Sequence, residues 1–223
     1  MTSNQLKLIA MVLMTIDHVG VELFPQMRIL RIIGRLTFPI FAYMIAEGCV
    51  HTKNRKKYLL TIVAFAAVCQ LVYLVAMGSL YMCILVTFTL SIILIYAFAN
   101  AAKHKNVMGW ILFAATLAAV YFVAEIVPVK FNVGDFYIDY GFAGIIVPLF
   151  VYIGRNKWEK LILLVVSLIL LSTSIGGYQW YCLLAVPLLM LYNGRRGEWK
   201  MKYLFYFYYP LHLVAIYFLS FII

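Results

Sequence analysis

An aspartate and a histidine stand side by side in the first apolar segment of the sequence, at Asp17 and His18. A single cation, Lys7, precedes His18 by eleven residues, which places both on one stripe of a helix about 16 Å apart along its axis. An imidazole with an ordinary pKa of about 6.5 is suited to remove a proton from an attacking amine or hydroxyl. Ionisable groups inside an apolar segment predict a functional site unless a structural partner accounts for them.

Three arginines, Arg28, Arg31 and Arg35, are spaced by three and four residues and so share one stripe of the second apolar segment. They could extend to the headgroups of the outer leaflet. Alternatively, they form a basic wall that pairs with buried carboxylates or binds an anionic substrate. A purely structural network of Arg–Asp pairs would give the same pattern. We expect a polar cluster with the carboxylates at the same depth: Asp17, Glu22, Asp135 and Asp139.

A second histidine, His212, lies in the last apolar segment, in the stretch FYYPLHL at 207–213. It stands about 13 Å into that segment from the inner face, close to the depth expected for His18. Pro210 removes one backbone hydrogen bond and can kink the helix beside it. His212 is therefore a second catalytic candidate, with Tyr209 as a candidate substrate contact. A hydrogen bond to a neighbouring helix is the simpler explanation of His212 taken alone.

The composition predicts an integral membrane protein, with 66% hydrophobic residues, 12% charged residues and a mean hydropathy of +0.99. We expect an all-α, polytopic helical bundle that forms one membrane domain over 1–223. About nine spans are predicted, although the short seventh and eighth segments meet at Gly176 and Gly177 and leave eight or ten possible. The apolar segments are 6–24, 30–50, 58–77, 80–100, 107–127, 137–154, 161–175, 177–192 and 203–222.

The lysines and arginines predict a cytoplasmic N-terminus, because inner loops retain such residues. In this orientation 14 of the 18 cations lie inside. The four outside are Arg28, Arg31, Arg35 and Lys130. The net charge of +10 then reflects topology and anionic headgroups, and it does not indicate nucleic-acid binding. The four cysteines have no metal-ligand spacing, so we expect no metal.

Long stretches of the chain resemble the TraX family of membrane proteins. They are NQLKLIAMVLMTIDHVG at 4–20, GRLTFPIFAYMIAEG at 34–48, HTKNRKKY at 51–58 and FYYPLHL. The family is named for a bacterial protein that N-acetylates pilin and is similar to the acyltransferase-three superfamily. The resemblance implies transfer of an acyl group from cytoplasmic acyl-CoA to an acceptor at the far face of the membrane. It also implies a multi-pass protein of the bacterial cytoplasmic membrane.

The superfamily pattern is a basic residue, ten intervening positions and a histidine, which Lys7 and His18 match. The resemblance implies that His18 is the catalytic base and that Lys7 lies toward the CoA. We expect Glu22, or a residue of another helix, to orient His18, and Asp17 to pair with Arg31 or Arg35. The phosphates of acyl-CoA should meet the basic inner loops, chiefly Lys53, Arg55, Lys56 and Lys57. The acceptor would enter past Arg31, Arg35, Asp139 and Tyr209.

The sequence thus predicts an acetyl-CoA-dependent membrane acetyltransferase. Its partners would be acyl-CoA, membrane lipids and an acceptor outside the cytoplasm, such as an exported peptide or a surface glycan. The alternative is a proton-coupled transporter whose buried Asp, His and Arg residues form a relay. A structural scaffold for assembly of a surface machine is a third interpretation.

Overall fold

The computed structural model describes residues 1–131, 134–198 and 202–220. Its described elements are helices, with one isolated bridge between Met82 and Ile138. The all-α prediction is confirmed. Within the described residues, five helices are long and apolar enough to cross a membrane, and Gly141–Ile153 and Phe207–Leu219 are shorter apolar helices. The five are Arg28–His51, Arg55–Val75, Ile84–His104, Val107–Phe131 and Lys157–Ile175.

The chain forms two compact units, one from Met1–Met44 with Lys157–Ile223 and the other from Ile45–Asn156. The first unit joins both ends of the sequence, so the units are not successive domains along the chain. It contains α1 (Ser3–Glu22), α2 (Arg28–Gly34), the beginning of α3 (Thr37–His51), α9 (Lys157–Ile175), the 3₁₀ helix η2 (Gly177–Leu184), α10 (Ala185–Met190) and α11 (Lys202–Leu219).

Helix α1 begins with a capping box, in which the Thr2 side chain accepts from the backbone of Gln5 and the Gln5 side chain accepts from the backbone of Thr2. Two further N–H groups of its first turn are satisfied by another segment of the unit. The Ser3 N–H donates to the Arg195 carbonyl at 2.9 Å, and the Asn4 N–H donates to that of Arg196 at 3.2 Å. The segment around Arg195 is therefore held against the start of α1.

Small residues let α2 lie close against α1. A Cβ at Gly20 would stand only 2.7 Å from the Cβ of Leu30, and a Cβ at Gly34 would overlap the carboxylate of Asp17. Because only glycine leaves this space, the arginines of α2 come within hydrogen-bond reach of α1.

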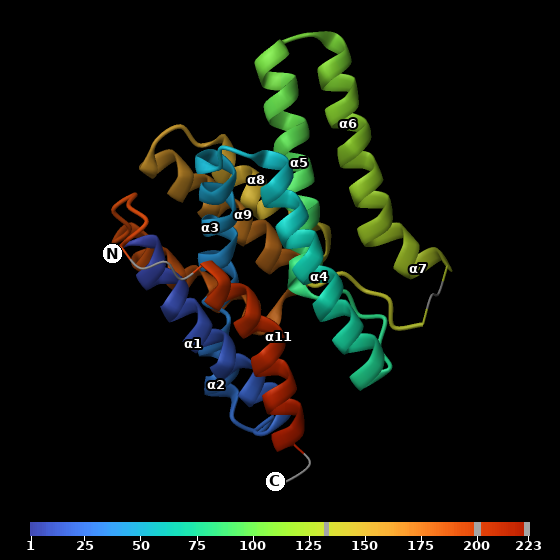
Figure 1. Cartoon of the computed structure of the whole chain (residues 1–223), viewed down its shortest axis with the longest axis vertical. Helices are drawn as coiled ribbons and strands as arrows, with labels where there is room; N and C mark the ends of the chain where they lie inside the picture. The colour runs from blue at the N-terminus through green and yellow to red at the C-terminus, as the bar shows by residue number, and fades with distance from the viewer. Residues whose placement is uncertain (132–133, 199–201, 221–223) are drawn as a thin grey trace. The chain divides into compact units, whose positions relative to one another are not determined.

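Helices α1 and α11 lie side by side in the first unit and run in the same direction (Figure 1). Thr15 of α1 is hydrogen-bonded to the hydroxyl of Tyr208, and His18 is hydrogen-bonded to His212. The second contact lies about one turn after the first on both helices, so the two contacts together fix the register of α11 against α1.

The second unit is built around α5 (Ile84–His104), which packs against α4 (Arg55–Met77), α6 (Val107–Tyr121) and α8 (Gly141–Ile153). Figure 1 shows α5 and α6 as a long hairpin. The helix that starts with α6 continues through the π-helix η1 (Phe122–Ile126) into α7 (Val127–Phe131). Ser91 of α5 donates to the Ile145 carbonyl of α8 at 2.7 Å, which ties the two helices within a core of aliphatic side chains.

Two connecting segments of this unit are joined by hydrogen bonds. The Met82 N–H donates to the Tyr137 carbonyl at 2.8 Å, and the Asp139 N–H donates to the Met82 carbonyl at 3.0 Å. The Ser79 hydroxyl and the Leu80 N–H both donate to Asp135. These hydrogen bonds, the one from Ser79 first, hold the pKa of Asp135 below its usual range.

Candidate functional site

The two histidines predicted inside apolar segments are hydrogen-bonded to each other. His18 Nδ1 lies 2.7 Å from His212 Nε2. The ring planes are within 5° of parallel, and the ring centroids are 4.8 Å apart. Because the bonded nitrogens are closer than two stacked rings could be, the rings meet edge to edge through this hydrogen bond. The His212 side chain is buried, whereas His18 is half-buried.

Residues of α11 hold the His212 ring in place. Its Nδ1 lies 2.9 Å from the carbonyl oxygen of Tyr208, one helical turn earlier. The Tyr208 ring is nearly parallel to it, and the Tyr209 ring meets it at an angle of 65°. Tyr209, predicted as a substrate contact, is buried against His212.

Asp17 is held by two arginines of the segment that follows α1. Its Oδ1 accepts from Arg31 Nη1 at 2.8 Å, and its Oδ2 accepts from Arg35 Nη2 at 2.7 Å. Arg35 also donates to Gln179 Oε1 of η2 at 3.4 Å. Both carboxylate oxygens of this catalytic candidate are thus bonded to guanidinium groups, so Asp17 positions the arginines and not the imidazole of His18.

Glu22, the other carboxylate proposed to orient His18, ends α1 with an exposed side chain. In the described structure, His18 Nδ1 is hydrogen-bonded to His212. The geometry supports the other expectation, that a residue of a different helix orients this imidazole.

Lys7 lies on α1 three turns before His18, and a second basic segment lies near it. The backbone of Arg196 bonds to Asn4, one turn before Lys7. The side chains of Arg195 and Arg196 are exposed. This end of the first unit therefore brings together the cations Lys7, Arg195 and Arg196, whose charges suit phosphate groups.

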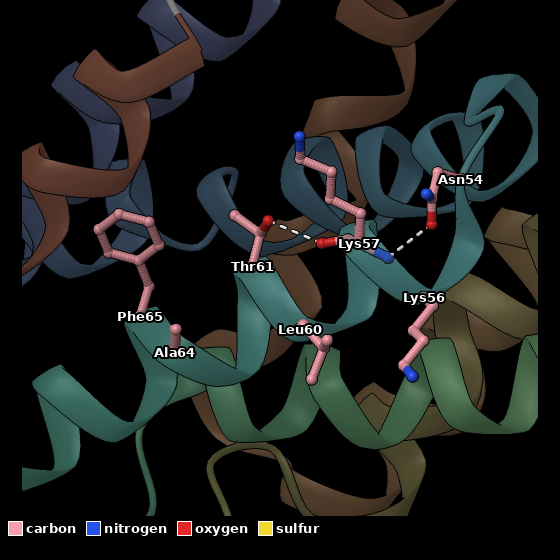
Figure 2. Close-up of a pocket in the computed structure, with 7 residues that line it drawn as sticks. All are labelled: Asn54, Lys56, Lys57, Leu60, Thr61, Ala64 and Phe65. Atoms are coloured by element: carbon pink, nitrogen blue, oxygen red, sulfur yellow. Dashed lines mark hydrogen bonds between the residues drawn. The ribbon is translucent and has the colours of Figure 1, made fainter.

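The predicted phosphate-binding residues Lys53, Arg55, Lys56 and Lys57 belong to the second unit. An open pocket of about 500 Å³ lies at the start of α4. Its lining consists of Asn54, Lys56, Lys57, Leu60, Thr61, Ala64 and Phe65. Figure 2 shows the side chains of Lys56 and Lys57 pointing to different sides of α4, so their ammonium groups do not converge on one point.

Asp139, predicted beside the path of the acceptor, also belongs to the second unit. Its Oδ1 accepts from the Tyr81 hydroxyl at 2.6 Å. Burial, with the charge of Asp139 as the next cause, raises the pKa of Tyr81, so the phenol keeps its proton and acts as the donor. In the described residues, no group of three or more His, Cys, Asp or Glu side chains could hold a metal ion.

Comparison with known proteins identifies the family. The family model described as TraX protein matches residues 2–220. The chain belongs to the TraX family. A protein of Dichelobacter nodosus described as probable fimbrial assembly protein FimC, serogroup H1, is 28% identical over 231 residues, which cover 95% of this chain and 93% of the relative.

A shorter match joins this TraX-family chain to an uncharacterized protein of Rickettsia prowazekii (strain Madrid E). The two are 50% identical over 38 residues, which cover 17% of this chain and 15% of the relative. No solved structure matches the chain.

Three residues of the site were not predicted from the sequence of this TraX-family member. Thr15 and Tyr208 bond across α1 and α11, and Gln179 accepts from Arg35. The sequence spacing could have indicated two of them, Thr15 and Tyr208. Thr15 precedes His18 by three residues and Tyr208 precedes His212 by four, the spacings that bring side chains to one face of a helix. The contact of Gln179 depends on η2, whose position no local pattern indicates.

Proposed function

We propose that this TraX-family chain transfers an acetyl group from cytoplasmic acetyl-CoA to an amine or hydroxyl at the outer side of the bacterial cytoplasmic membrane. The observation that carries the proposal is the imidazole of His18, half-buried on α1, hydrogen-bonded by His212 and three turns from Lys7. Such a group can act as a general base away from bulk water.

The proposed reaction needs one proton to be taken up and returned. His18 removes a proton from the acceptor amine or hydroxyl while the acceptor nitrogen or oxygen attacks the thioester carbonyl carbon. The carbon–sulfur bond then breaks, and the acetyl group stays on the acceptor. The protonated imidazole gives its proton to the departing CoA thiolate, which leaves His18 neutral for the next cycle.

The cations at the start of α1 suit the donor in this proposal. CoA carries several phosphates, and Lys7, Arg195 and Arg196 belong to the same unit as His18. The pantetheine arm of CoA is about as long as the separation of about 16 Å between Lys7 and His18 along α1. The thioester could then reach His18 while the nucleotide remains near these cations.

The relatives support one class of acceptor. The Dichelobacter nodosus relative is described as a probable fimbrial assembly protein and aligns over nearly the whole chain. The family resemblance implies acetylation of a pilin. We therefore propose an exported fimbrial or pilus subunit as the acceptor, with Arg31 and Arg35 near its path.

The test compares cells that carry the wild-type chain, His18→Ala or His104→Ala. His104 is an exposed residue at the end of α5 and serves as the matched control. Mass spectrometry of exported subunits and surface glycans should find an added acetyl group with the wild type and with His104→Ala. With His18→Ala, the acetylated fraction should fall at least about 100-fold, the usual contribution of a general base.

Binding of the donor provides the second measurement. Acetyl-CoA should raise the thermal unfolding midpoint of the detergent-solubilised wild type and of His18→Ala, because the proposal gives His18 a role in the reaction and not in phosphate binding. Near-normal acetylation with His18→Ala would contradict the proposal. Proton flux that depends on His18, without any acetylated product, would favour the transporter.

A further inference from the structure

A chain of two hydrogen bonds runs from the backbone of α11 through His212 to His18. We infer that His212 is a positioning residue that holds neutral His18 with its proton on Nδ1, so that Nε2 is the nitrogen that takes the acceptor's proton. The tautomer follows from the hydrogen bonds alone. Its catalytic consequence rests on the proposed function.

The first step starts at the carbonyl of Tyr208. His212 Nδ1 lies 2.9 Å from that oxygen, which can only accept a hydrogen bond. His212 Nδ1 must therefore carry a proton. A neutral imidazole has one N–H, so the other nitrogen of His212, Nε2, is an acceptor.

The second step uses the protonation of His212 to find which nitrogen of His18, on α1, carries the proton. His18 Nδ1 lies 2.7 Å from His212 Nε2. Because Nε2 of His212 accepts, Nδ1 of His18 must donate and must carry the single proton of the neutral ring. The lone pair of His18 is then on Nε2. Among the described residues, no side chain or backbone group is hydrogen-bonded to this nitrogen.

The hydrogen-bond chain also prepares the pair for the proton that the reaction supplies. When His18 Nε2 takes a proton, its Nδ1–H can pass to His212 Nε2. His18 is then neutral with a proton on Nε2, and His212 carries the charge with a proton on both nitrogens. The Nδ1–H of His212 still donates to Tyr208 throughout. The first state is restored when His18 Nε2 gives its proton to the departing CoA thiolate and the shared proton returns along the same bond to His18 Nδ1.

The direct test is ¹⁵N NMR of histidine-labelled, detergent-solubilised full-length chain. The chain has four histidines, and His51 and His104 are exposed, so His51→Gln with His104→Gln leaves only the pair. At neutral pH we expect both rings to carry the proton on Nδ1, whereas free histidine favours Nε2. A His18 signal with the proton on Nε2 would overturn the inference, and this measurement needs no substitution at His212.

Two substitutions at His212 separate positioning from packing. In His212→Phe the ring remains but the acceptor is lost, so His18 should shift toward the Nε2–H tautomer and acetylation should fall at least about 100-fold. A misplaced tautomer costs about 10⁴-fold in a serine protease triad. In His212→Gln the side-chain oxygen can accept near the position of Nε2, and most of the activity and the Nδ1–H tautomer should return.

The outcomes distinguish this inference from the proposed function. Unchanged activity and an unchanged His18 tautomer in His212→Phe would overturn the positioning role. Equal losses in His212→Phe and His212→Gln, with the Nδ1–H tautomer kept in both, would assign His212 to packing and also overturn it. Full activity of His18→Ala would remove the proposed function but would leave the NMR result standing.

Discussion

At the scale of single residues, Asp17 and His18 are neighbours in the sequence but contact different helices. Adjacent residues of a helix point about 100° apart. Asp17 therefore faces α2 and binds Arg31 and Arg35, while His18 faces α11. The side chain of Asp17 is only 12% exposed, so its two ion pairs are largely shielded from water.

Asp17→Asn should destabilise the protein strongly, because two arginines then lose their shared counter-charge in a buried place. We expect the free energy of unfolding in detergent to fall by about 3 kcal/mol. The matched control is Glu22→Gln, which removes the same charge from an exposed position of the same helix and should change stability by less than about 0.5 kcal/mol. Denaturant titration followed by circular dichroism measures both. Equal effects would show that the arginines do not depend on Asp17.

The sequence indicated both histidines of the site but not their contact. Each was found as an ionisable residue in an apolar segment, and their depths were expected to be similar. The hydrogen bond, however, joins residues 194 positions apart. It depends on which faces of α1 and α11 meet, and an apolar helix surface does not reveal whether it faces lipid or another helix. The sequence left either Glu22 or a residue of another helix to orient His18, because sequence spacing identifies only neighbours on one helix.

At the scale of elements, a π-helical turn places a carboxylate at the start of another helix. Glu125 lies in η1, and its Oε1 accepts from the Phe142 N–H of α8 at 2.7 Å. A Cβ at Gly141 would stand 2.8 Å from that oxygen, and Gly141 has a φ of +55°. A negative charge here satisfies one free N–H and interacts favourably with the helix dipole.

Glu125→Ala should therefore weaken the start of α8. The expected loss is about 1–2 kcal/mol in the free energy of unfolding, typical of a lost helix cap. Glu125→Gln keeps an oxygen acceptor and should lose less than half of that. Hydrogen exchange at the Phe142 amide should become faster in the alanine variant. An exchange rate at Phe142 that is the same in all three proteins would contradict the capping role.

Helix positions were more predictable than such details. Among the described residues, each of the nine apolar segments expected from the sequence overlaps helical structure, although 80–83 and 137–140 lie outside the helices. Runs of apolar residues are the strongest local signal for spans. The sequence treated 107–127 as one regular segment. The structure inserts η1 and continues the helix to Phe131. A lone Glu125 in an apolar run was the available sign of this irregularity, since a carboxylate there requires a partner.

At the scale of the whole molecule, the first unit is assembled from segments at both ends of the chain. The site residues His18, Asp17, Arg31, Arg35, Gln179 and His212 all belong to it. The order of segments along the sequence does not show this grouping, because it depends on which helices pack together. The second unit is one continuous stretch and contains the basic start of α4.

The orientation expected from the distribution of cations can be measured with single cysteines. The four native cysteines are at most 3% exposed and should not react with a membrane-impermeant maleimide. Lys130→Cys should be labelled on intact cells, and Lys103→Cys should be labelled only after permeabilisation. Both positions are exposed at the ends of helices in the second unit. The opposite pattern would place the start of the chain outside the cell.

Because α1 and α11 run in the same direction, they restrict whether the number of membrane crossings is odd or even. Two helices that cross a bilayer in the same sense must be separated by an odd number of crossings, because the chain has to return to its starting side before the second one. If α1 and α11 are the first and last of the predicted spans, the total number of crossings must be odd. Of the eight, nine or ten crossings that the sequence predicts, only nine is odd.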